Sequence, residues 1–199
     1  MHTTTTTRAL AVAAALTLGL TLASCSTGNS SSETGSSSSS TSAASAHNDQ
    51  DVMFAQMMLP HHKQAVEMSD MLLAKGSGVD TDVTDLAKQI KAEQSPEINQ
   101  LTTWLKGWDE PTESEHSGMG HSMSGMMSDS DMDDLDQASA KDAAKLYLEE
   151  MIQHHKGAVD MAKTEVTKGK NTDAVAMAKS IVSSQTEQIT QMQDMLASL

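Results

Sequence analysis

Cysteine and aromatic residues are nearly absent from this chain of 199 residues. The single cysteine is Cys25, and the aromatic residues are Phe54, Trp104, Trp108 and Tyr147. One cysteine near the N-terminus argues against a disulfide framework and against a thiol nucleophile in the body of the chain. Trp104 and Trp108 lie one helical turn apart, which predicts that they cover the hydrophobic core at a helix end.

Positive charge is also scarce. The chain has 13 Lys and Arg against 27 Asp and Glu, which gives a formal net charge of −14. This acidity argues against a nucleic-acid partner and against a basic membrane-binding surface. The sequence contains no Gly-rich phosphate loop and no Gly-x-Ser-x-Gly motif, and no pair of carboxylates stands out. We therefore expect no enzyme activity.

The N-terminal residues have the features of an export signal. Arg8 supplies a positive charge, and the apolar run over residues 9–22 is too short to span a membrane comfortably. The run ends in Leu22-Ala-Ser-Cys25, which resembles a bacterial lipobox, a motif whose cysteine is lipidated. The sequence predicts a signal peptide over residues 1–24 and an extracytoplasmic protein anchored to the bacterial membrane by lipid on Cys25. An ordinary signal peptide with an incidental cysteine is the alternative.

A tether is expected between the anchor and the folded domain. Residues 25–47 are mostly Ser, Thr, Gly and Ala, a composition that cannot bury enough apolar surface to offset the entropy of ordering. The remaining chain, residues 48–199, is long enough for one domain with a hydrophobic core.

An internal repeat predicts the architecture of this domain. Residues 58–68 (MLPHHKQAVEM) align with residues 151–161 (MIQHHKGAVDM), and the similarity extends over repeats of residues 51–108 and 141–199. Each repeat consists of two helical segments around a Gly-containing turn, and no segment alternates with the period of a strand. Two hairpins with one apolar face each are best buried against each other. We therefore expect an all-α four-helix bundle, with residues 109–140 as a Met/His-rich linker.

Local signals indicate where the second helix of each hairpin begins. Asp80 or Thr81 is the candidate N-cap in the first repeat, and Thr172 or Asp173 is the candidate in the second. Pro96 lies within the second helix, but the second repeat keeps the same spacing without a proline. The repeat therefore predicts a continuous helix with a local kink.

Each repeat carries a His-His pair on its first helix. Alternating spacings of four and three residues define the buried seam of the first repeat, which contains Phe54, Met58, His61, Ala65, Met68 and Leu72. His61 and its counterpart His154 are thus expected to face the core, whereas His62 and His155 lie at the edge of the seam. A buried imidazole needs hydrogen-bond partners. The opposing helices could supply them through Gln94, Glu97, Gln185 and Gln188.

The ligand types in these helices indicate copper. Imidazole and thioether without thiolate suit copper, with Cu(I) favoured, whereas structural zinc normally adds Cys or carboxylate. A di-iron bundle needs Glu-x-x-His pairs, which the sequence lacks. The simplest site takes one methionine and the first histidine from each hairpin, while the second histidines complete it or hold separate ions. The candidate metal ligands in the bundle are Met58, His61, His62, Met151, His154 and His155.

The linker holds a second group of soft ligands. Exposed methionine has little packing role in such a segment, so a metal-binding function is favoured for His116, Met119, His121 and Met123. Met126 and Met127 could equally bind metal or pack onto the bundle, and Met132 could pack in the same way. Ser128 or Asp129 could cap a short helix that runs through Leu135.

These motifs resemble the secreted bacterial family called domain of unknown function 305. The resemblance rests on the tandem Met-x-x-His-His-x-x-Ala motif, on the Gln-x-x-Glu-Ile-x-x-Leu-x-x-Trp-Leu stretch (residues 94–105) and on the Met-rich linker, and it covers residues 48–199. It implies a ferritin-like four-helix bundle and, for some members, periplasmic copper binding and copper tolerance. It adds support for the paired histidines and their neighbouring methionines. The sequence departs from internal symmetry at Gln188, where the first repeat has Glu97.

Two hypotheses of different class follow. The first is a lipid-anchored copper-binding protein that sequesters copper or delivers it to a trafficking partner of unknown identity. The alternative is a non-catalytic structural or interaction module, in which His–Gln networks only fix helix packing. A metal-dependent redox enzyme would need an open coordination position and an oxidisable substrate, and the sequence indicates neither.

Overall fold

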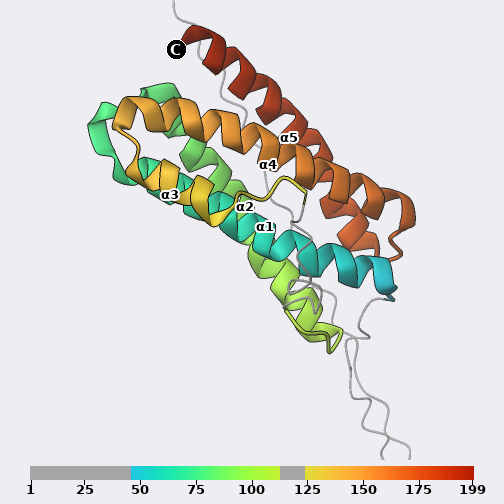
Figure 1. Ribbon diagram of the computed structural model, residues 1–199. Helices are drawn as coiled ribbons and strands as arrows, with labels where there is room; N and C mark the ends of the chain where they lie inside the picture. Colours follow the sequence, from blue (N-terminus) through green and yellow to red (C-terminus); the bar gives the residue numbers. More distant parts are fainter. Residues whose placement is uncertain (1–45, 113–123) are drawn as a thin grey trace, which may run out of the picture. The chain divides into compact units, whose positions relative to one another are not determined.

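Five α-helices and one short 3-10 helix make up the secondary structure of the described residues (Figure 1). The computed structural model describes residues 46–112 and 124–199, all within one compact unit of the chain. The α-helices are α1 (Asp49–Ala74), α2 (Thr81–Gly107), α3 (Asp129–Gln137), α4 (Ala140–Lys168) and α5 (Thr172–Ser198), and η1 (Gly76–Gly78) joins α1 to α2. No strand occurs in the two described ranges, and the all-α prediction is confirmed. The predicted signal peptide and Cys25 lie outside them.

Polar side chains cap the second helix of each hairpin. Asp80 caps α2, as the sequence indicates. The cap of α5 is Asn171, so the prediction of Thr172 or Asp173 was wrong. The Asn171 side chain accepts hydrogen bonds from the backbone N–H groups of Asp173 and Ala174. Its amide oxygen thereby satisfies two of the four N–H groups that the first turn leaves without helical partners.

Proline does not interrupt the long helices. Pro60 lies inside α1, and Pro96 lies inside α2, which is continuous as the repeat predicts.

In the linker, Ser128 caps α3 through a capping box, and this helix runs to Gln137, slightly beyond its predicted end at Leu135.

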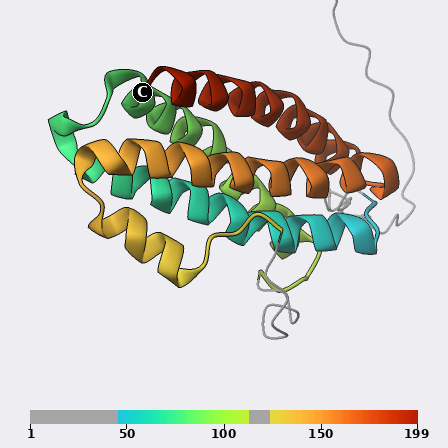
Figure 2. The same ribbon diagram turned by 45° about the horizontal axis from the view of Figure 1, so that its top comes forward.

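The helices pack as two hairpins that share a central pair. Helix α1 packs along α2, and α4 packs along α5. The hairpins meet mainly through α1 and α4, whereas α5 has only slight contact with α1 and α2 (Figures 1 and 2). Helix α3 lies against α1 and α4. Helices α1 and α4 are therefore the central elements of the bundle, and each is covered by the second helix of its own hairpin.

The two central helices run antiparallel. Near the start of α1, the Asp51 carboxylate accepts hydrogen bonds of 2.9 to 3.2 Å from the backbone N–H groups of Lys170 and Asn171, which follow α4. At the opposite end, Gly78 packs so closely on the start of α4 that a Cβ added to it would lie 2.7 Å from the Cβ of Ala140. Each contact joins the first hairpin to one end of α4, so the two contacts fix the alignment of the hairpins.

The hydrophobic core is divided into two clusters. Along α1, Met58 belongs to one cluster and Ala65 to the other. Along α4 the order is reversed, since Met151 shares the cluster of Ala65 and Ala158 shares that of Met58. This exchange is the local two-fold relationship expected of a duplicated hairpin. No helix in the described residues is long and apolar enough to cross a membrane.

Stacked rings cover the end of α2. The centroids of Trp104 and Trp108 lie 6.0 Å apart, and His47 stacks on Trp108 with a centroid distance of 4.6 Å. Trp108 is 9% exposed and belongs to the core cluster that contains Met58. The predicted place of the two tryptophans at a helix end is confirmed.

Candidate metal centre

Four histidines lie in the interior between the two core clusters. His61, His62 and His155 have no exposed surface, and His154 is 1% exposed. The pairs occupy the middle of α1 and α4, between residues that belong to different core clusters. Burying four imidazoles costs free energy unless their nitrogens find hydrogen-bond or metal partners, so the partners of each ring decide what this layer does.

The first histidine of each pair meets its counterpart. The ring centroids of His61 and His154 are 3.7 Å apart, with an interplanar angle of 41°. The two residues occupy equivalent positions in the repeats, so the contact lies on the local two-fold relationship. Both lie in the core, as the helical spacing predicts. The structure thus brings together one histidine from each hairpin.

The second histidine of each pair points to the outer helix of its own hairpin. His62 Nε2 lies 2.8 Å from Glu97 Oε2 on α2, and His155 Nε2 lies 2.8 Å from Gln188 Oε1 on α5. The sequence placed both rings at the edge of the seam, and the structure adds that they are fully buried and in contact with the outer helices. The predicted hydrogen-bonding role of the outer helices is confirmed for Glu97 and Gln188.

Burial keeps the rings of His61, His154 and His155 neutral. It lowers the pKa of His61 to about 3, with a further contribution from His62, and it lowers the pKa of His155 to about 4. The pKa of His154 is also far below its ordinary value, first because of burial and then because of the charge that His61 or His155 would carry. A neutral imidazole is the form that coordinates metal.

Several ring nitrogens have no partner among the described residues. They are Nδ1 of His61, His62 and His155 and both nitrogens of His154. Buried polar groups in folded proteins are nearly always hydrogen-bonded, and an unsatisfied one costs about 1–3 kcal/mol. The interior therefore contains a concentrated set of nitrogen lone pairs that packing alone does not satisfy.

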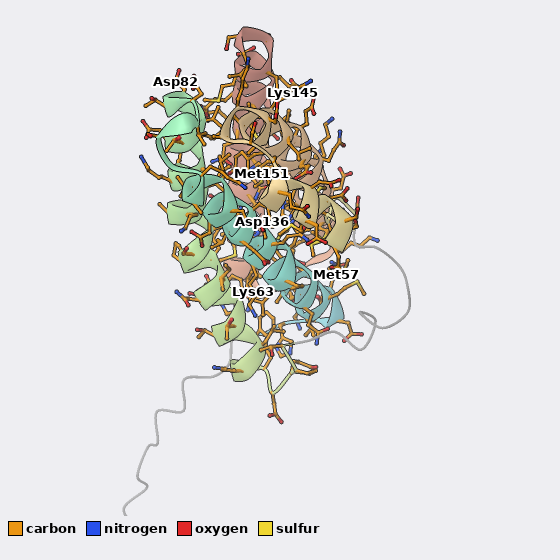
Figure 3. The ribbon with its side chains drawn as sticks, turned by 60° about the vertical axis from the view of Figure 1, so that its left-hand side comes forward. Met57, Lys63, Asp82, Asp136, Lys145 and Met151 are labelled. Carbon is orange, nitrogen blue, oxygen red and sulfur yellow. The ribbon has the colours of Figure 1, made fainter. Side chains whose placement is uncertain are left out.

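The methionines beside the histidines lie on opposite sides of this layer. Met58 and Met151 are fully buried, and they belong to different core clusters. Figure 3 labels Met151 near the middle of the bundle. The structure therefore places one thioether on each side of the His61–His154 contact. Each methionine precedes the first histidine of its repeat by three residues, so the two-fold relationship puts the methionines on opposite sides.

The end of the linker docks beside the histidine layer. His61 Nε2 lies 3.3 Å from the backbone oxygen of Ser124, and the Gln64 side chain bonds both the N–H and the carbonyl of Met127 at 2.9 Å. Gly157 makes the approach possible, because a Cβ on it would lie 1.9 Å from Ser124 O. Gln64 and Gly157 occupy equivalent positions in the repeats. The glycine in place of glutamine is the sequence signal for this docking, which was not predicted from the sequence.

The predicted linker ligands fall into two groups. His116, Met119, His121 and Met123 lie outside the described residues. Met127 and Met132 pack against the core cluster that contains Met151, so the packing interpretation holds for these two residues. Met126 is half-buried.

The donor set fits a soft ion better than a carboxylate-bound one. In the part of the chain that the structure describes, no group of three or more His, Cys, Asp and Glu side chains is arranged to hold a metal. The interior instead offers imidazole nitrogens and thioether sulfurs, and such ligands suit copper, with thioether in particular favouring Cu(I). Unpaired buried nitrogens are the observation on which this fit rests.

These features define an all-α protein in which two duplicated hairpins form a four-helix bundle around a buried histidine layer. The chain belongs to the family described as domain of unknown function (DUF305), which matches residues 51–196. None of the curated proteins matches the chain.

Solved structures of similar chains share this fold. A DUF305 protein from Streptomyces coelicolor, described as secreted, is 35% identical with a TM-score of 0.69, over 75% of this chain and 93% of its own. A DUF305 fragment from Deinococcus radiodurans is 29% identical with a TM-score of 0.69, over 76% and 98%. CopM in its Cu(I)-bound form is 28% identical with a TM-score of 0.62, over 74% and 96%. CopM is also known in Cu(II)-bound and silver-bound forms.

Proposed function

We propose that this chain binds copper outside the cytoplasm through the histidines and methionines of its bundle. The observation that carries the proposal is the buried layer of four imidazoles, in which five ring nitrogens have no partner among the described residues. Neutral imidazoles with free lone pairs are poised to bind a metal and are costly in a site without one. The protein sequesters copper, confers tolerance to it or delivers it, and no reaction is assigned to it.

The chemistry of the ligands favours Cu(I). The layer contains His61, His62, His154 and His155, and Met58 and Met151 flank it with soft thioether sulfur. CopM, whose structure is similar to this chain, has Cu(I)-, Cu(II)- and silver-bound forms. Silver(I) resembles Cu(I) in its preference for soft ligands, so these forms support a site of the same character in this chain.

Two segments outside the described residues complete the proposal. The linker group of His116, Met119, His121 and Met123 would bind copper, and the described residues that follow it dock beside His61. Lipid on Cys25 would hold the protein on the extracytoplasmic side of the membrane. A relative described as secreted agrees with this location.

Anaerobic titration of the full mature chain with Cu(I), in competition with a chromophoric chelator, tests the bundle site. The double variant with His61→Ala and His154→Ala should lose the site that binds Cu(I) with the highest affinity. The matched control is His47→Ala, which removes a histidine that stacks on Trp108 outside the layer and should leave this site unchanged. Equal affinity of the double variant and the unaltered chain, with the linker intact, would remove the bundle site from consideration.

A structural role for the histidines is the second candidate. It is favoured by the bond between His155 and Gln188 and by the bond between Gln188 and Glu93, which together connect α4, α5 and α2. This role predicts that the protein purified from its native envelope contains no metal. Elemental analysis of such a preparation separates the two candidates.

A further inference from the structure

Three of the four buried histidines share one hydrogen-bonding pattern. In His61, His62 and His155, Nε2 faces an oxygen atom, while Nδ1 has no partner among the described residues. The oxygen belongs to the Ser124 backbone for His61, to Glu97 for His62 and to Gln188 for His155. A backbone carbonyl and a carboxylate only accept hydrogen bonds, so His61 and His62 must donate from Nε2–H.

The direction of the third bond is fixed by a carboxylate further out. Gln188 Nε2 donates to Glu93 Oε2 at 2.8 Å. Because a carboxylate accepts and an amide nitrogen donates, this contact turns Gln188 Oε1 toward His155. His155 Nε2–H therefore donates to Gln188 Oε1, and His155 takes the same tautomer as His62. The chain of bonds runs from α4 through α5 to α2, where the two outer helices are only in slight contact.

From these contacts we infer that Glu97, Gln188 and Glu93 are positioning residues of the metal centre. They hold His62 and His155 as Nε2–H tautomers and thereby present Nδ1 of each ring as the metal-binding atom. This inference rests on the proposed copper-binding function, and it assigns the ligating atoms and the outer helices that select them. Histidines that bind metals generally donate their other ring N–H to a carboxylate or carbonyl, which sets both ring orientation and ligand basicity.

The two repeats differ in the strength of this support. His62 donates directly to a carboxylate, whereas His155 donates to the neutral amide of Gln188, and the Glu93 carboxylate is one bond further away. A charged acceptor makes the stronger hydrogen bond and the more basic ligand. The His62 half of the centre is therefore the stronger electron donor, and the exchange of Glu97 for Gln188 between the repeats is a functional asymmetry.

A role in packing alone does not account for this pattern. A histidine that only fixes helix register is expected to have both ring nitrogens satisfied once it is fully buried. Here the outer helices satisfy Nε2 of His62 and His155, and Nδ1 of each has no partner among the described residues. In each ring the contact from the outer helix thus satisfies one nitrogen, and the second nitrogen is available to a ligand.

The test begins with the metal-free full chain. Long-range proton–nitrogen correlation spectra of the histidine rings report the tautomer, and we expect Nε2–H for His62 and His155. Glu97→Ala should leave His62 as a mixture of its two tautomers, and Gln188→Ala should do the same for His155. In the Cu(I) competition titration each should weaken binding by about ten- to one-hundred-fold. Glu97→Gln keeps an acceptor oxygen and should restore the tautomer and most of the affinity.

Matched controls separate this effect from a general loss of charge or stability. Asp85→Ala and Glu187→Ala alter exposed acids on the same two helices, and neither should change tautomer or affinity. Nδ1–H tautomers in the unaltered chain, or unchanged affinity in both alanine variants at the contact positions, would overturn the inference while leaving copper binding intact. If the unaltered chain bound no Cu(I), the proposed function would fall and the inference with it. The metal-free spectra distinguish these failures.

Discussion

His61 and His154 lie ring against ring, with centroids 3.7 Å apart, where the two central helices of the bundle pack together. One ring comes from each repeat, and both are buried in their neutral forms. A metal bound at this contact joins the hairpins, because its ligands come from both. Copper binding and bundle stability are therefore expected to be thermodynamically coupled.

The first prediction concerns this coupling. A Cu(I) concentration one hundred times the Kd should stabilise the folded chain by about 2.7 kcal/mol. Thermal unfolding with and without Cu(I), under anaerobic conditions, measures the shift in Tm. The variant with His61→Ala and His154→Ala should show little shift, whereas His47→Ala should shift like the unaltered chain. Equal shifts in all three proteins would contradict a copper site between the hairpins.

The second prediction separates the ligand role of methionine from its packing role. Met58→Leu and Met151→Leu conserve volume and should each cost less than about 1.5 kcal/mol of unfolding free energy. If the thioethers bind copper, Cu(I) affinity should fall by about tenfold or more, which corresponds to about 1.4 kcal/mol. Met192→Leu is the control, since Met192 is a buried methionine that is not part of the repeated motif in the sequence. Affinity that survives both substitutions would restrict the site to the histidines.

The third prediction concerns the docked end of the linker. Gly157→Ala places a Cβ against the backbone of Ser124, at a distance of 1.9 Å in the present structure. We expect either that residues 124–127 no longer pack against α4 or that the free energy of unfolding falls by about 1–3 kcal/mol, the usual cost of overpacking. Limited proteolysis near residues 124–127 and urea unfolding measure the two outcomes.

Gly107→Ala is the matched control for the linker experiment. Nothing lies within 4 Å of a Cβ at this position. Alanine there should leave protease sensitivity unchanged and should not destabilise the helix, since alanine has the higher helix propensity. A Gly157→Ala protein with the same proteolysis pattern and stability as this control would show that the close approach is not needed.

The fourth prediction is a dependence of stability on pH. Glu165 is fully buried beside the Asp51 carboxylate, and burial, with Asp51 next, raises its pKa from 4.5 to about 8. Between these values the unfolded chain ionises this group while the folded chain keeps it protonated, so its contribution to stability is lost as the pH rises. The slope for one such group reaches about 1.4 kcal/mol per pH unit.

Glu165→Gln isolates this group, because the amide mimics the protonated acid at every pH. In urea unfolding the variant should gain stability relative to the unaltered chain as the pH is raised from 5 toward 8. Glu187→Gln, at an exposed position of α5, should not change the pH profile. Parallel profiles for Glu165→Gln and the unaltered chain would show that the buried carboxyl does not titrate in this range.

The fifth prediction concerns the anchor. If Cys25 is lipidated, Cys25→Ala should move the protein from the membrane fraction to the soluble extracytoplasmic fraction, because the thiol that would carry the lipid is gone. Detergent phase partitioning of the two proteins measures the change, and mass spectrometry of the mature N-terminus identifies the lipid. A variant that remained in the membrane fraction would contradict the lipobox interpretation.

The predicted parts of the fold follow from local periodicity. The spacing around His61 and His154 determined which face of each helix turns inward, since 3.6 residues per turn fix the face whatever the partner. The duplication determined that Pro96 lies in a continuous helix, because the second repeat shows the same spacing without proline. The cap of α5 was misplaced, because Asn171, Thr172 and Asp173 can all cap a helix and only the tertiary arrangement selects one.

The sequence by itself therefore determined the helices, the duplication and the inward histidines. Only the tertiary structure decided which atoms meet. The burial of His62 and His155 depends on the positions of α2 and α5, and the docking of Ser124 depends on the close approach to Gly157. Helical periodicity is local, whereas the contact of His61 with His154 depends on how two distant helices align. That alignment is set by antiparallel packing and by hydrogen bonds such as those that Asp51 accepts from the turn after α4.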